Sequence, residues 1–174
     1  MNDFVNPHQR VAVFVDVQNV YHTAKHLYKS RVNFEQVLST AVRGRNLIRA
    51  LAYVVESGIE EEKGFFEALK KAGYEIKSKD LQIFAGGQKK ADWDVGIAID
   101  MIKMSVKMDA MVLISGDGDY IPLIQYLQFL GLRVEVVSFG KSTSAKLKEV
   151  VDEYIDLDNN PEEYLMRKGI KIKK

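Results

Sequence analysis

Residues 111–120 have the sequence MVLISGDGDY, in which an apolar run leads directly into two aspartates, Asp117 and Asp119. A run that is apolar at every position, and not at every second one, is typical of a strand buried on both faces of a parallel sheet. Ligands of such sheets bind beyond the carboxyl ends of the strands. The stretch therefore predicts an α/β fold in which a central strand presents acidic side chains to a ligand.

A second apolar run lies near the N-terminus and also ends in an aspartate. Residues 10–16 have the sequence RVAVFVD, and Asn19 follows Asp16 by about one helical turn. At that distance Asn19 can point back to the same pocket and hold an aspartate or a metal-bound water in position. The alternative for Asp16 is a structural role as the cap of the following helix.

A third acidic motif, KKADWDVGIAID, opens a helix predicted over residues 92–106. Asp92 and Asp94 lie near the N-terminus of this helix, where the helix dipole favours acidic residues, so capping is their structural alternative. Asp100 lies within an apolar stretch, where a buried acid needs a partner, and a structural role is favoured for it.

The three motifs together predict a metal site. Four aspartates are expected to meet in one pocket: Asp16, Asp94, Asp117 and Asp119. Carboxylates crowded together repel one another, which costs free energy unless a cation joins them. Hard divalent cations prefer oxygen ligands, so Mg²⁺ or Mn²⁺ is the expected cofactor. Lys89 and Lys90 can contact phosphate beside the metal, although exposed lysines are usually only solvated.

Glycines and histidines near these motifs have competing interpretations. Gly116 and Gly118 would let the backbone approach a ligand closely, and a glycine-rich turn with solvated acids is the alternative. His22 and His26 are spaced to share one face of a helix, but no third zinc ligand accompanies them.

The composition is that of an ordinary folded domain of 174 residues, with 47% hydrophobic and 28% charged residues. The net charge of +1 means that affinity for nucleic acid has to come from local basic patches, and it does not oppose a homodimer. The absence of cysteine excludes disulfides and thiolate chemistry and is compatible with a reducing cytoplasm. Neither a secretory signal nor a membrane-spanning run is apparent, so a cytoplasmic protein without membrane contact is expected.

Strands alternate with helices along the chain, which indicates a three-layer αβα fold with a largely parallel central sheet. Further strands are predicted over residues 47–55 and 133–139, helices over 17–29, 34–41, 60–72 and 120–130, and edge-like β segments within 74–84. The helix over 92–106 is expected to have an apolar face formed by Val95, Ile99 and Ile102.

Three regions are expected. Residues 1–9 form a polar lead-in, residues 10–157 the folded domain, and residues 158–174 a basic tail. Such a tail can bind RNA electrostatically, or it can be a disordered end.

The order VAVFVDVQN, KKADWDVGIAIDM and MVLISGDGDYIPLI, followed by LGLRVEVV, resembles the NYN domain in its LabA-like branch. That family belongs with the PIN-like and flap-nuclease group of metal-dependent ribonucleases, and the resemblance covers residues 10–157. It implies a PIN-like, Rossmann-like fold and the hydrolysis of phosphodiester bonds with Mg²⁺ or Mn²⁺. Single-stranded or structured RNA is the implied substrate, and DNA is the alternative.

The resemblance also implies roles for individual residues. The matched acidic pocket consists of Asp16, Asn19, Asp94 and Asp117, with Asp119 as a close fourth carboxylate. Where relatives often show Lys-Gly-x-Asp, this chain has Lys90-Ala-Asp92-Trp-Asp94, and of the two acids we select Asp94 as the one that faces the metal. Asp100 also falls on an acidic position of the family.

The implied chemistry is an in-line attack of a metal-activated water on phosphorus. Asp16 and Asp117 would bind the metal, and Asp94 and Asp119 would bind it directly or through water. Asn19 and Ser115 would orient these groups. Tyr21 and Trp93 are candidates for stacking on bases, although packing in the core is the commoner role of an aromatic residue.

Two alternatives to a ribonuclease remain open at this point. The first is a regulatory RNA- or protein-binding module with little or no catalysis on the same fold. The second is a Toprim-like phosphotransfer site, which also places an Asp-x-Asp pair after a strand. That fold would need a glutamate at the end of the first strand, where this chain has Asp16 followed by Asn19.

Overall fold

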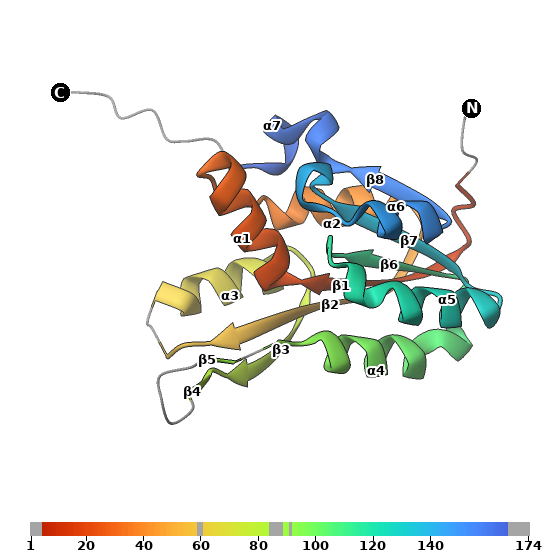
Figure 1. Cartoon of the computed structure of the whole chain (residues 1–174), viewed down its shortest axis with the longest axis horizontal. Helices are drawn as coiled ribbons and strands as arrows, with labels where there is room; N and C mark the ends of the chain where they lie inside the picture. The colour runs from red at the N-terminus through yellow and green to blue at the C-terminus, as the bar shows by residue number, and fades with distance from the viewer. Residues whose placement is uncertain (1–4, 59–60, 84–88, 91, 167–174) are drawn as a thin grey trace.

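The computed structural model of the chain describes residues 5–58, 61–83, 89–90 and 92–166. Strands and helices alternate along the chain and form three layers, with one sheet in the middle and helices on both of its faces (Figure 1). The sheet has six parallel strands in the order β3-β2-β1-β6-β7-β8. Their bounds are β1 (Arg10–Asp16), β2 (Asn46–Glu56), β3 (Glu75–Asp80), β6 (Ala110–Ile114), β7 (Arg133–Ser138) and β8 (Glu153–Asp156). The predicted three-layer fold with a parallel sheet is confirmed.

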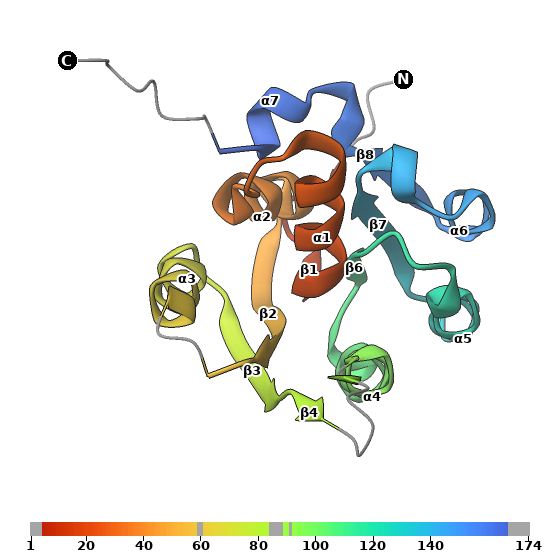
Figure 2. The ribbon, with the colours of Figure 1, turned by 60° about the vertical axis from the view of Figure 1, so that its left-hand side comes forward.

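Helices cover both faces of this sheet (Figure 2). One face is covered by α1 (Val17–Tyr28), α2 (Phe34–Val42) and α3 (Glu61–Lys71), together with the short α7 (Pro161–Tyr164). The other face is covered by α4 (Asp94–Met104), α5 (Ile121–Phe129) and α6 (Ala145–Val150). A short antiparallel pair, β4 (Gln82–Ile83) and β5 (Lys89–Lys90), follows β3.

The two apolar runs of the sequence form the central strands β1 and β6. Every residue from Val11 to Val15 is fully buried, and alternate side chains enter the cores on opposite faces of the sheet. Val11 lies opposite Ala110 and Val15 opposite Ile114, so the two strands end side by side. The chain leaves β1 toward one edge of the sheet and β6 toward the other, which makes their carboxyl ends the usual place for a ligand.

The apolar face predicted for α4 is wrong. Val95, Ile99 and Ile102 are 70%, 44% and 41% exposed, and the buried side chains of this helix are Ile97 and Met101. The helix is apolar almost all round, with the sequence VGIAIDMIKM after its first residue, so its periodicity does not select one face. Packing against the sheet makes that selection.

The other predicted elements are present with small changes at their ends. Asn33 caps α2, because its Oδ1 accepts the backbone N–H of Gln36 at 3.2 Å. The helix expected to reach residue 106 ends at Met104 and continues as a 3₁₀ turn, Ser105–Lys107. Residues 167–174 of the predicted basic tail lie outside the described residues. Within the described ranges, no helix has the length and apolarity needed to cross a membrane.

Candidate metal centre

The carboxyl end of β1 places Asp16 in the candidate site. Its carboxylate caps α1 by accepting the backbone N–H of Asn19 at 3.1 Å. The side chain of Asn19 points to the neighbouring strand end, where its Oδ1 accepts the N–H of Gly116 at 3.0 Å. Asp16 therefore has the capping role considered for it, and Asn19 joins the first turn of α1 to the loop after β6.

The loop after β6 supplies two further carboxylates. Asp117 begins a 3₁₀ turn, because its Oδ1 accepts the backbone N–H of Asp119 at 2.9 Å. Ser115 is fully buried, and its Oγ accepts the N–H of Asp117 at 3.3 Å. Hydrogen bonds within the loop thus fix the direction of both acids.

Three carboxylates gather at this point. Oxygen atoms of Asp94, Asp117 and Asp119 lie within 4.8 Å of one another. Asp94, the first residue of α4, and Asp117 are half-buried, whereas Asp119 is exposed. A set of oxygen ligands at such distances fits a hard divalent cation, which binds carboxylates at about 2.0–2.6 Å.

Tyr120 connects Asp16 to this group and was not identified from the sequence. Its buried hydroxyl donates to Oδ1 of Asp94 at 2.9 Å and lies 3.5 Å from Oδ2 of Asp16. Burial raises the pKa of Tyr120, and so does the charge of the neighbouring carboxylates, so the hydroxyl keeps its proton. Its position directly after SGDGD is the one sign of this role in the sequence, where Tyr120 is otherwise the first residue of a predicted helix.

The pocket disfavours its own negative charge. Burial raises the pKa of Asp16 to about 6. A hydrogen bond from the backbone of Asn19 opposes this rise, and the charges of Asp94 and Asp117 add to it. Burial also raises the pKa of Asp94, with further contributions from Asp117 and other nearby acids. A bound cation would offset this cost.

Asp16→Asn should stabilise the metal-free protein at neutral pH but not in acid. Folded Asp16 keeps its proton up to a pKa of about 6, whereas the value for an unperturbed carboxyl is 3.8. The wild type should therefore lose stability relative to the variant as the pH rises from 3.8 to about 6. Above pH 7, the two free energies of unfolding should differ by about 2–3 kcal/mol. Urea unfolding in EDTA at several pH values measures it. A difference that does not change with pH would contradict the ionisation of Asp16 as its cause.

Asp100 has a structural role away from the three carboxylates. It accepts hydrogen bonds from Tyr53 Oη at 2.8 Å and from Lys77 Nζ at 2.6 Å. Burial raises the pKa of Asp100, but these two donors together bring it below the usual range. Asp100 thus joins α4 to β2 and β3. Asp92 lies two residues before the start of α4 and is exposed.

The predicted substrate contacts lie in different environments. The ring of Tyr21 packs against Phe65 of α3, with centroids 6.5 Å apart. Lys89 and Lys90 form β5, but their side chains lie outside the part of the structure that is described. Trp93, a second stacking candidate, donates from Nε1 to the carbonyl of Val54 at 2.7 Å, as a packing residue does.

Gly116 and Gly118 serve the packing of two loops. A Cβ on Gly116 would lie 2.9 Å from Thr143 Oγ1 and 3.2 Å from the Cα of the same residue. A Cβ on Gly118 would lie 2.9 Å from Ser144 Oγ. The two glycines were expected to let the backbone approach a ligand, but here they let it approach the segment before α6. Ser144 N in that segment also donates to the Gly116 carbonyl at 3.0 Å.

Gly116→Ala should therefore destabilise the fold by about 1–3 kcal/mol, because the backbone of Thr143 has to move. Gly64→Ala is the matched control, since a Cβ there meets nothing within 4 Å and the residue lies in α3. That control should be neutral or stabilising by up to about 1 kcal/mol. Urea unfolding compares the two, and equal effects would contradict the loop contact.

The family model described as NYN domain matches residues 10–158. The chain belongs to the NYN domain family. This NYN domain is 29% identical over 160 residues to the low amplitude and bright protein LabA of Synechococcus elongatus. The aligned region covers 86% of this chain and 84% of LabA. The resemblance to the LabA-like branch is confirmed.

A solved structure is also similar to this NYN domain over nearly all its length. It is the crystal structure of a protein of unknown function, VPA0982, from Vibrio parahaemolyticus. The two have a TM-score of 0.84 and 30% sequence identity, with 93% of this chain and 99% of that chain covered. The overall fold is therefore shared with an experimentally determined structure.

Proposed function

We propose that this NYN domain is a metal-dependent nuclease that hydrolyses phosphodiester bonds in single-stranded or structured RNA in the cytoplasm, with Mg²⁺ or Mn²⁺. The observation that supports this most directly is the approach of three carboxylates, Asp94, Asp117 and Asp119, within 4.8 Å. Asp117 and Asp119 follow the carboxyl end of the central strand β6, where ligands of such sheets bind, and Asp94 at the start of α4 lies beside them.

Asp94, Asp117 and Asp119 would hold the cation, with Asp16 placed beside them through Tyr120. A divalent cation bound there would supply a nucleophilic water at neutral pH and would offset negative charge on the phosphate. Tyr120 would keep the Asp94 carboxylate in one orientation. Such supporting hydrogen bonds typically change metal affinity or activity by about 10–100-fold when they are removed.

The accessibility of the site supports a polymeric substrate. Asp119 is exposed and Asp117 is only half-buried, so a long chain could reach the carboxylates without entering a closed cavity. Lys89 and Lys90 precede Asp94 in the same motif and are proposed as contacts for substrate phosphates. Ser115 would act indirectly, by holding the N–H of Asp117.

Cleavage of end-labelled RNA tests this proposal. The substrates are a single-stranded RNA, an RNA hairpin and a single-stranded DNA, each incubated with Mg²⁺, Mn²⁺ or EDTA. We expect cutting of RNA that depends on the metal and stops in EDTA. A folded protein that is stabilised by Mn²⁺ but cuts none of the three would contradict a nuclease. That outcome would favour the regulatory binding module.

A further inference from the structure

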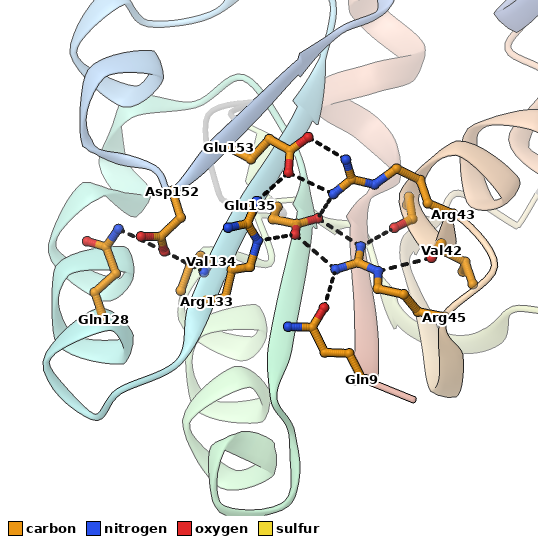
Figure 3. Close-up of polar contacts among 11 residues, drawn as sticks. Gln9, Val42, Arg43, Arg45, Gln128, Arg133, Val134, Glu135, Asp152 and Glu153 are labelled. Atoms are coloured by element: carbon orange, nitrogen blue, oxygen red, sulfur yellow. Dashed lines mark hydrogen bonds and ion pairs between the residues drawn. The ribbon is translucent and has the colours of Figure 1, made fainter. Parts of the chain in front are cut away.

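Three arginines and two glutamates meet near the amino-terminal ends of β7 and β8 (Figure 3). Arg133 and Glu135 come from the start of β7, and Glu153 from the start of β8. Arg43 and Arg45 come from the connection between α2 and β2. Because all six strands are parallel, these amino-terminal ends lie away from the carboxylates of the metal centre.

Glu135 is the centre of this cluster, and its side chain is fully buried. It accepts from Arg45 Nη1 and Nη2 at 2.9 and 2.8 Å, from Arg43 Nη2 at 2.8 Å and from Arg133 Nε at 2.7 Å. Glu153 accepts two hydrogen bonds from Arg43 and one from Arg133. The acceptor capacity of the two carboxylates is thus almost entirely used.

The donors of the cluster are not all used. Arg45 is satisfied, because its remaining N–H groups donate to Gln9 Oε1 and to the carbonyls of Ala41 and Val42. Nε of Arg43 is buried and has no hydrogen-bond partner among the described residues. Arg133 donates only from Nε and Nη2 to described residues, which leaves its Nη1 without an acceptor there. An unpaired buried donor costs free energy.

The cluster also has an excess of positive charge. Three guanidinium groups carry one positive charge more than the two carboxylates can offset, and arginine does not lose its proton in proteins. The unused donors and the excess charge are on the same two side chains, Arg43 and Arg133. Both are partly accessible, with side chains 21% and 40% exposed.

A cavity of about 200 Å³ lies against this cluster. It is lined by the arginines and glutamates and, on its other side, by Val5, Asn6 and Gln9. Sites for drug-sized ligands usually measure about 300–1,000 Å³, so this cavity is suited to a smaller guest. Its polar lining and excess positive charge select an anion.

We propose that this arginine pocket binds a small oxyanion of the phosphate class. The guanidinium groups of Arg43 and Arg133 come from different elements, the connection between α2 and β2 and the strand β7, and both side chains line the cavity. A tetrahedral oxyanion offers oxygen atoms on all sides, whereas a carboxylate offers them in one plane. This site is independent of the metal centre and of the proposed nuclease activity.

Calorimetric titration with inorganic phosphate, at constant ionic strength balanced by chloride, tests the pocket. We expect saturable binding of one phosphate, with a Kd on the order of millimolar. Arg133→Gln removes unused donors and the excess charge, and it should weaken binding at least about tenfold. Arg49→Gln is the matched control, since Arg49 is an exposed arginine paired with Glu75 elsewhere on the sheet, and it should bind as the wild type does.

A second measurement keeps the test valid if Arg133→Gln does not fold. In the wild type, phosphate should shift the Nε–H resonance of Arg43 and leave that of Arg49, which donates to Glu75 outside the cavity, in place. An unmoved Arg43 resonance at high phosphate would overturn the proposal. Heats that never saturate and are equal in the three proteins would do the same, and so would equal binding of acetate.

The source of the phosphate group is distinguished by a further titration. A nucleoside monophosphate that binds as tightly as inorganic phosphate, or more tightly, would identify the guest as a phosphate carried on a small molecule. Weaker binding of the nucleotide would identify free phosphate, as the small volume of the cavity leads us to expect.

Discussion

Asp117→Asn is expected to reduce metal-dependent cleavage of RNA by at least about a hundredfold, and to remove the stabilisation that Mn²⁺ gives the wild type. Asparagine keeps the Oδ1 that accepts the backbone N–H of Asp119, so the turn should remain. It removes one of the three negative charges within 4.8 Å that would attract the cation. Single-turnover cleavage and the melting temperature, each measured over a range of Mn²⁺ concentrations, check both effects.

The control for this variant is Asp80→Asn. Asp80 also ends a parallel strand of the sheet, but it is exposed and lies at the end of β3, outside the group of three carboxylates. It should cut RNA and respond to Mn²⁺ as the wild type does. Cleavage that survives in Asp117→Asn would assign the activity to another site or to a contaminating nuclease.

Glu135→Gln should lower the free energy of unfolding by about 3–5 kcal/mol, the typical cost of removing one partner from a buried ion pair. The variant leaves Arg45, whose side chain is 1% exposed, without the carboxylate that receives two of its hydrogen bonds. Arg43 and Arg133 lose the same partner. Urea unfolding at neutral pH measures the loss.

Glu75→Gln provides the comparison for an exposed pair. Glu75 also receives two hydrogen bonds from one arginine, Arg49, but both side chains are about half exposed. Water can replace the lost carboxylate there, so we expect a cost of about 0–1 kcal/mol. A similar cost for both variants would show that burial of Glu135 adds nothing to the strength of its contacts.

The sequence was sufficient to predict the centre of the sheet and the place of its acidic side chains. The continuous apolar runs of β1 and β6 are buried on both faces; Asp16 follows the first run directly, and Asp117 lies three residues after the end of the second. Because the strands are parallel, their carboxyl ends lie at the same end of the sheet, and these residues lie there together. Local sequence is enough for this prediction because the pattern and the polar residue lie in the same short segment.

Contacts between distant segments were not predictable in this way. Glu135 appears in the sequence as a charged residue within a buried strand, which indicates that it needs a partner. Nothing near it shows that the partners are Arg43 and Arg45, about ninety positions earlier. The hydrogen bond from Tyr120 to Asp94 depends in the same way on how α4 and the loop after β6 pack.

The position of β1 within the sheet has a consequence for the synthesis of the chain. It leaves the ribosome before the other five strands of this sheet, yet Val11 lies between Leu47 of β2 and Ala110 of β6. The half formed by β1, β2 and β3 can pair as soon as it is made, whereas the second edge of β1 has no partner until β6 emerges. Pairing of distant segments is slow, and an unpaired strand edge is prone to aggregation. The nascent chain is therefore most vulnerable while residues 81–110 are still being added.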